Sequence, residues 1–514
     1  EMGAIGMISY NAKGDPTLLR WKGFHISGKE TPFFGFHLCR NDAEYLKGLL
    51  RKGTVRVWVK IKSRFFKGKI ENLYAIIRGR TKPEDEVILA CHITHPRGLV
   101  SDDASGCGLI LEIARVIKKL IDENKIKLPK RSIKFLFATH VVGSMAHTYH
   151  HYCQKDRMVG GLALDMVAED LDKTGGGPLF LIRTPDSLPS YLPDFYHALL
   201  KEACKESSGF SPHFRFQEIK YNFCGEPCAF VDSTVGVPMV QFTCHNIYHH
   251  TNYDCVEKTS PKTLWRIGRV ATLGTLIIAN AGFLDILRII CEVIRFSSIR
   301  ISEVAAETIS KIISMIKSGA SRDELVQAGI WGIKKIRHIL SRDVDAVRST
   351  LRLLNLCTTS ERARLNKICE HSCHELKQKA KIEEQKLIQI FRTLTGIDLK
   401  SVPSKKCSEL NIVPKRLYLG LFPMRYQFFE FISSLYDEWL KSYPKEELEE
   451  LSTAVILEIL NYIDGSRNIT EIAEKVSLEY GYIKPEYVEL ILRVMENFGF
   501  VKLETIKKGQ SRND

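Results

Sequence analysis

Histidine and aspartate side chains lie at the ends of apolar segments in this sequence, where they could bind a metal ion. His92 follows the apolar run 87–90, and Asp102 begins an Asp-Asp pair further along. Asp165 closes a second apolar segment, and His250 lies in a polar loop after a third. Imidazole and carboxylate are both zinc ligands, and a buried, ionised aspartate needs a cation or strong donors beside it. The pattern therefore predicts a metal site.

An alternation of strands and helices is predicted to bring these side chains together. Strands are expected at residues 87–93, 132–138, 160–167, 179–183 and 237–242, separated by helices at 106–123, 143–154, 191–206 and 261–279. This order predicts an α/β fold with a largely parallel sheet flanked by helices. Such folds place their chemistry beyond the carboxyl ends of the strands. His92 and Asp165 stand at two of those ends.

Length and composition are those of an ordinary globular protein. The chain has 514 residues, of which 44% are hydrophobic and 26% charged, enough for two to four domains. No uncharged apolar run reaches the roughly 18 residues of a membrane span, and the first residues do not resemble a signal peptide. The 14 cysteines are scattered without a paired pattern, which is typical of reduced thiols. We therefore expect a cytoplasmic protein without a membrane partner.

The net charge of +14 raises the question of nucleic-acid binding. Part of the basic excess falls on residues 286–410, where acidic residues are interspersed and helical patterns predominate. Because no basic groove with interleaved aromatic residues accompanies it, a solvated helix surface explains the charge better. The amphipathic helices from 283 to about 395 could also supply the interface of a homo-oligomer.

The C-terminal segment is predicted to form a winged helix-turn-helix. Helices at 469–476 and 485–498 follow an Asp464-Gly465 turn, and a short strand comes last. The second of these helices carries three glutamates against one arginine, which would repel phosphate groups. A protein partner is therefore expected here rather than DNA.

The metal-binding pattern resembles the co-catalytic zinc aminopeptidase and glutamate carboxypeptidase family. The resemblance covers about residues 72–280 and rests on His92, then Asp102-Asp103-Ala-Ser-Gly, then Asp165 in Leu-Ala-Leu-Asp-Met-Val, then Tyr248-His249-His250-Thr251 with Asp254 downstream. It implies a peptidase fold that binds two zinc ions. It also implies removal of N-terminal residues from peptides by a water that bridges the two metals.

The resemblance assigns a role to each ligand. Asp102 would bridge the two zinc ions, His92 and Asp165 would complete one site, and His250 would serve the other. A cis peptide bond is expected between Asp102 and Asp103, as in the family.

The chain departs from the family pattern after the strand at 132–138. Relatives carry two adjacent glutamates there, a general base and a zinc ligand, whereas this chain has Thr139 and His140. His140 could still bind zinc, because imidazole replaces carboxylate in many sites. Glu169 and Glu226 are the nearest candidates for the base. The alternative is a catalytically impaired homologue that binds peptides or proteins in its pocket.

These patterns predict five segments. Residues 1–70, with a strand within 2–10, a helix at 42–50 and a strand at 54–61, resemble the protease-associated domain inserted in many family members. The chain would then begin inside that insert, with the first peptidase elements upstream. The other segments are a zinc peptidase domain at 71–282, a helical region at 283–410, a connector at 411–450 and the winged helix at 451–508.

Overall fold

A seven-stranded mixed sheet forms the centre of the protein. The computed structural model describes residues 4–19, 34–62, 64, 66–95, 99–205, 214–222, 225–401, 411–422, 427–449 and 451–505. The sheet strands are β3 (Leu73–Ile77), β4 (Lys82–His92), β5 (Arg131–Ala138), β6 (Met158–Asp165), β7 (Leu179–Ile182), β8 (Phe216–Ile219) and β9 (Met239–Thr243). Their order across the sheet is β3-β5-β4-β6-β9-β7-β8. The predicted α/β class is confirmed.

The central strands β5, β4, β6 and β9 run parallel, so their carboxyl ends share one edge of the sheet. His92 pairs with Ala138, and Asp165 pairs with Thr243. The side chains that end β4 and β6 are therefore level with the last residues of β5 and β9. This register, together with the parallel order, creates one place where several loops meet.

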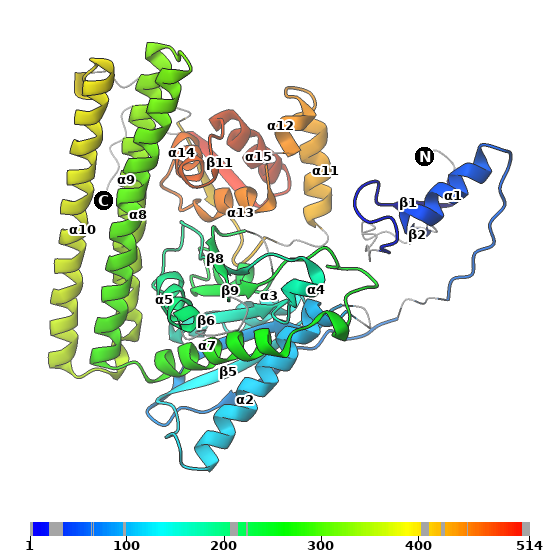
Figure 1. Ribbon diagram of the computed structural model, residues 1–514, viewed down its shortest axis with the longest axis horizontal. Coiled ribbons are helices and arrows are strands. Elements are labelled where there is room, and N and C mark those ends of the chain that lie inside the picture. Colours follow the sequence, from blue (N-terminus) through cyan, green and yellow to red (C-terminus); the bar gives the residue numbers. More distant parts are fainter. Residues whose placement is uncertain are drawn as a thin grey trace.

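Helices cover both faces of the sheet (Figure 1). Helices α2 (Gly106–Asp122), α5 (Leu192–Lys205) and α7 (Pro261–Asn280) pack in one core with Val87 and Leu89 of β4. Ile88 and Ala90 point to a second core, which includes residues of α6 (Pro227–Phe230) and, at its margin, of α3 (Val142–His150). Because alternate side chains of β4 enter two cores, the strand reads as a continuous apolar run.

The N-terminal residues lie beside this body and are linked to it by an extended segment (Figure 1). β1 (Gly6–Tyr10) pairs in parallel with β2 (Phe34–Leu38), and α1 (Arg40–Leu50) follows. The sequence did not predict β2. Residues 54–61, predicted as a strand, form no strand in the structure. Among the strands of the described residues, none pairs with this segment.

Three long helices follow the sheet domain, as the sequence predicted. These are α8 (Phe283–Lys317), α9 (Arg322–Ser349) and α10 (Thr359–Thr395), which stand side by side in Figure 1. The guanidinium group of Arg300 on α8 donates to both carboxylate oxygens of Asp194 on α5, at 2.5 and 2.9 Å. It also contacts Asp343 on α9, so this ion network joins the helices to the sheet domain.

The C-terminal part has its own core. It contains α13 (Thr453–Asn461), α14 (Ile469–Tyr480), α15 (Pro485–Asn497) and β11 (Val501–Thr505), in the predicted order. β11 pairs antiparallel with β10 (Ile412–Arg416). α11 (Gln427–Trp439) adds Phe431, Leu435 and Trp439 to the same core, and α12 (Lys445–Glu449) follows it. Residues 411–450 therefore do more than connect two domains.

Several short helical segments complete the fold. They include α4 (Leu171–Thr174) and the irregular turn Val100–Ser105 before α2. Within the described ranges, no helix combines the length and apolar character that a bilayer crossing requires.

A buried carboxyl group helps to dock the C-terminal part onto the sheet domain. Glu458 of α13 is fully buried and accepts hydrogen bonds from the backbone N–H and the hydroxyl of Ser187, at 2.7 and 2.8 Å. Burial raises the pKa of Glu458 to about 7. Glu479 of α14 is also buried, and burial and the charge of Asp186 raise its pKa well above the ordinary value.

We expect this docking to weaken as the pH rises. The pKa of Glu458 in the folded protein exceeds the ordinary value of 4.5. Its stabilising contribution is therefore fully present below about pH 4.5 and is lost as the pH rises through about 7. Glu458→Gln cannot ionise and should raise the melting temperature at pH 8 by a few degrees, with little change near pH 5. Thermal unfolding followed by circular dichroism measures this, with exposed Glu446→Gln as the control. Equal pH profiles for parent and Glu458→Gln would contradict it.

Candidate metal centre

Asp102 lies at the centre of the site, close to four histidine side chains. Its Oδ1 is 3.2 Å from Nε2 of His92 and 2.9 Å from Nε2 of His95. Its Oδ2 is 3.1 Å from Nε2 of His249 and 2.7 Å from Nε2 of His250. Each oxygen of one carboxylate thus faces two imidazole nitrogens.

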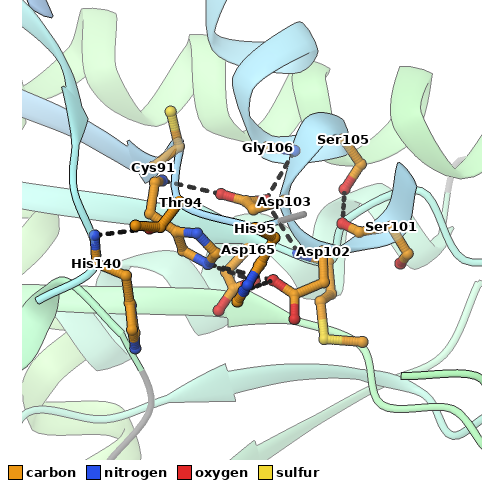
Figure 2. A network of polar contacts seen from close by, with 12 residues as sticks. Cys91, Thr94, His95, Ser101, Asp102, Asp103, Ser105, Gly106, His140 and Asp165 are labelled. Atoms are coloured by element: carbon orange, nitrogen blue, oxygen red, sulfur yellow. Dashed lines mark hydrogen bonds and ion pairs between the residues drawn. The ribbon is translucent and has the colours of Figure 1, made fainter. Parts of the chain in front are cut away.

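Asp165 reaches the same place from the end of β6. Its Oδ1 lies 3.7 Å from Nε2 of His92, and its Oδ2 accepts a hydrogen bond from Nε2 of Gln241 on β9, at 3.0 Å. Figure 2 shows His95, Asp102 and Asp165 converging from separate elements. The structure therefore brings His92, Asp102, Asp165 and His250 close together.

Asp103 anchors the turn that carries Asp102. The peptide bond between the two aspartates is cis, which confirms the expectation from the family resemblance. The carboxylate of Asp103 accepts hydrogen bonds from the backbone N–H groups of His92 and Gly106, each at 3.0 Å. It thereby ties the end of β4 to the start of α2 (Figure 2).

Asp254 holds the same turn from a different loop. Its side chain is buried and accepts hydrogen bonds from the backbone N–H groups of Ser101, at 2.7 Å, and Asp102, at 3.2 Å. The position of Asp102 thus depends on the carboxylate of Asp254, which lies 152 residues further along the chain.

His140 and Glu226 form a pair at the edge of the cluster. The backbone N–H of His140 donates to the Thr94 hydroxyl at 2.8 Å (Figure 2), and its Nδ1 lies 3.3 Å from Oε1 of Glu226. Glu226 is fully buried at the start of α6 and, with His92 and His140, forms a group of converging donors. Burial raises the pKa of Glu226, but the charges of His92 and His140 outweigh burial and lower it. No donor group within the described ranges contains both His140 and His250.

Glu169, the other candidate base, is buried elsewhere. Its carboxylate accepts a hydrogen bond from Nδ2 of Asn246, and its backbone forms an isolated bridge with Thr259. It belongs to none of the donor groups that the described residues form. Its contacts instead fix the loop that follows β9.

The histidines control the charge of Asp102. Burial alone would raise the pKa of this carboxyl group, but the imidazoles of His249, His250, His92 and His95 outweigh burial. The pKa of Asp102 therefore lies well below its ordinary value. The side chain is a buried carboxylate that needs positive charge nearby.

The donor set fits a metal ion. Oδ1 of Asp102, Oδ1 of Asp165 and Oε2 of Glu226 are buried and have no hydrogen-bond partner among the described residues. Leaving buried anionic oxygens without partners is costly, and a cation would satisfy them. Imidazole nitrogen with carboxylate oxygen is a donor set that suits zinc and related divalent ions.

Residues 72–274 match a family model described as Peptidase family M28. This part of the chain is similar to M28 peptidases. It runs from the residue before β3 into α7 and contains every residue of the metal centre. No curated protein matches the chain.

Solved structures resemble parts of the chain. The M28 peptidase precursor of Shewanella amazonensis is 16% identical, covers 54% of this chain and 61% of its own, and gives a TM-score of 0.40. A leucine aminopeptidase precursor of Bacteroides thetaiotaomicron is 18% identical, covers 46% and 87% of the two chains, and gives a TM-score of 0.30. A Clostridium acetobutylicum protein matches at 12% identity over 84% of this chain and 60% of its own, with a TM-score of 0.31. The matched region thus spans about 60% of two of these three structures.

Two further side chains, His95 and His249, contact Asp102, and sequence reasoning assigned neither of them as a metal ligand. His95 lies three positions after His92, and His249 directly precedes His250, so both were visible beside predicted ligands. Their contacts depend on loop conformations that the spacing does not define. Asp254 was noticed in the motif, but its backbone contacts could not be predicted.

Asp254→Ala should weaken both the fold and the metal centre. The substitution leaves two buried N–H groups without an acceptor, at a cost of about 1–3 kcal/mol each. Because one of them belongs to Asp102, zinc affinity should fall about tenfold or more, as for other residues that orient ligands. Urea unfolding and competition with a chromophoric chelator measure the two effects, with the exposed Asp122→Ala as control. Parent-like zinc affinity in Asp254→Ala would show that Asp254 does not position Asp102.

Proposed function

We propose that this chain is a zinc-dependent aminopeptidase that hydrolyses the N-terminal residues of peptides. The observation that carries this proposal is the position of Asp102, whose two oxygens each face imidazoles at the carboxyl edge of a parallel sheet. One carboxylate can thus be shared by two cations. The M28 match supports a peptide substrate. The preference for a free N-terminus comes from the family resemblance.

Asp102 would bridge two zinc ions, with His92 and Asp165 at one and His250 at the other. When bound, zinc would supply Lewis acidity and a water that loses its proton near neutral pH. The chain itself must then accept that proton and deliver it to the departing amine.

Glu226 is the proposed proton acceptor. Its side chain is fully buried, and it converges with His92 and His140 on one region beside the proposed zinc ligands. One carboxylate oxygen lies 3.3 Å from Nδ1 of His140, and the other has no hydrogen-bond partner within the described chain. The first oxygen is thus oriented, and the second can take a proton. Glu169, which holds Asn246 outside the donor groups, is the weaker candidate.

His140 would then orient Glu226 instead of replacing the second glutamate of the family as a ligand. The pair would restore, from β5 and α6 together, a carboxylate that relatives carry directly after the strand. The pair of His140 and Glu226 would thus link β5 and α6, which lie far apart in the sequence.

The second candidate function is binding of peptides or proteins without hydrolysis. The observation that favours it is Thr139, which stands where relatives carry the basic glutamate. A threonine hydroxyl does not accept a proton near neutral pH. If Glu226 cannot reach the attacking water, the pocket retains ligand binding alone.

Hydrolysis of aminoacyl-p-nitroanilides and short peptides by the zinc- or cobalt-loaded protein tests the proposal. We expect turnover of substrates with a free N-terminus and none of N-acetylated ones. Glu226→Gln should lower kcat by about 10²–10⁴-fold without loss of metal, whereas the matched control Glu169→Gln should retain activity. Asp102→Ala should lose both metal and activity. A metal-loaded protein that binds peptides but cleaves none of a broad panel would favour the second candidate.

A further inference from the structure

Two histidines contact Asp102 from positions to which the family resemblance assigns no role. Nε2 of His95 lies 2.9 Å from Oδ1, and Nε2 of His249 lies 3.1 Å from Oδ2. These distances resemble the 3.2 and 2.7 Å of His92 and His250, the expected ligands. His95 follows β4 and His249 follows β9, so two separate loops bring them to the same carboxylate.

We propose that His95 and His249 are direct metal ligands, so that each oxygen of Asp102 shares one cation with a pair of imidazoles. His92 and His95 would hold the cation at Oδ1, and His249 and His250 would hold the cation at Oδ2. In each trio with Asp102, the ligand atoms lie within 4.8 Å of one another. The inference rests on the metal centre of the proposed function and adds two ligands to it.

The first pair is almost closed to solvent. The side chains of His92 and His95 are 2% and 11% exposed, and their rings meet edge to face with centroids 4.7 Å apart. Oδ1 of Asp102 is buried, and the Nε2 atoms of both rings lie within 3.2 Å of it. A cation among the three atoms would satisfy all of them.

The second pair depends on an unusual backbone conformation. Adjacent side chains in extended chain point to opposite sides, yet His249 and His250 both reach Oδ2 of Asp102. His250 has a φ of 58°, in the left-handed region that residues other than glycine seldom adopt. Such conformations cluster at functional sites, where the surrounding structure maintains them. The two rings lie 3.9 Å apart and are more exposed than the first pair, so this cation would face solvent.

The two pairs are also in contact with each other. The rings of His95 and His250 have centroids 4.8 Å apart, so the added ligand of one pair packs against the expected ligand of the other. Four imidazoles around one carboxylate make a nitrogen-rich centre. Such a donor set favours zinc, cobalt and nickel over magnesium and manganese, which prefer oxygen ligands. It would also offset the loss of the carboxylate ligand that relatives carry after β5.

Metal binding by the full-length chain tests the inference without reference to turnover. Metal-free His95→Gln and His249→Gln, with exposed His150→Gln as control, are titrated with cobalt and followed by ligand-field absorption. Each test variant should bind one of two cobalt ions at least tenfold more weakly, with an altered spectrum, and His150→Gln should match the parent. Circular dichroism of the metal-free proteins verifies folding. Parent-like affinity, stoichiometry and spectrum in both test variants would overturn the inference.

X-ray absorption at the zinc edge of the parent protein gives a second test that no substitution can disturb. The inference requires at least four imidazoles shared between two zinc ions, an average of two or more for each ion. An average of one, from His92 and His250 alone, would overturn it even if the variants failed to fold. A protein with the full imidazole count that cleaves no peptide would refute the proposed function and leave this inference intact.

Discussion

A buried carboxylate that needs positive charge beside it dominates this structure. Asp102 is almost completely inaccessible, and its two oxygens face imidazoles on both sides. Removing a carboxylate from water costs several kcal/mol unless positive charge or hydrogen bonds replace the solvent. Here Asp103 and Asp254 fix the turn through its backbone, and the histidines fix the side chain. The whole carboxyl edge of the sheet is organised to keep one anionic group in one place.

The chain has Thr139 and His140 where relatives carry two glutamates, and in the structure His140 pairs with the carboxylate of Glu226. The strand β5 delivers an imidazole where relatives deliver carboxylates, and α6 supplies a fully buried glutamate opposite it. The two residues come from opposite halves of the region that matches the M28 family model. The chemistry of the site therefore depends on how α6 packs against β9 and α3, and not on one strand end alone.

The sequence predicted the elements more readily than the contacts between them. Periodic apolar runs identified β4, β5, β6 and the long helices, and the rule that chemistry lies at strand ends placed His92 and Asp165 correctly. The sequence did not predict β2 or β8, because short half-buried strands carry little periodicity. It did not predict β10 either, because the central Pro414 argues against a strand. The neighbours of Asp102 depended on loops whose conformation tertiary contacts determine. The contacts of His95 and His249 and the orientation of the His140 side chain all depend on such loops.

Anomalous diffraction at the zinc edge tests the central claim most directly. Crystals of the full-length chain grown with zinc should show two peaks, one beside each oxygen of Asp102, with His92 and His95 around the first and His249 and His250 around the second. A single peak remote from Asp102, or no peak in the presence of excess zinc, would contradict the account.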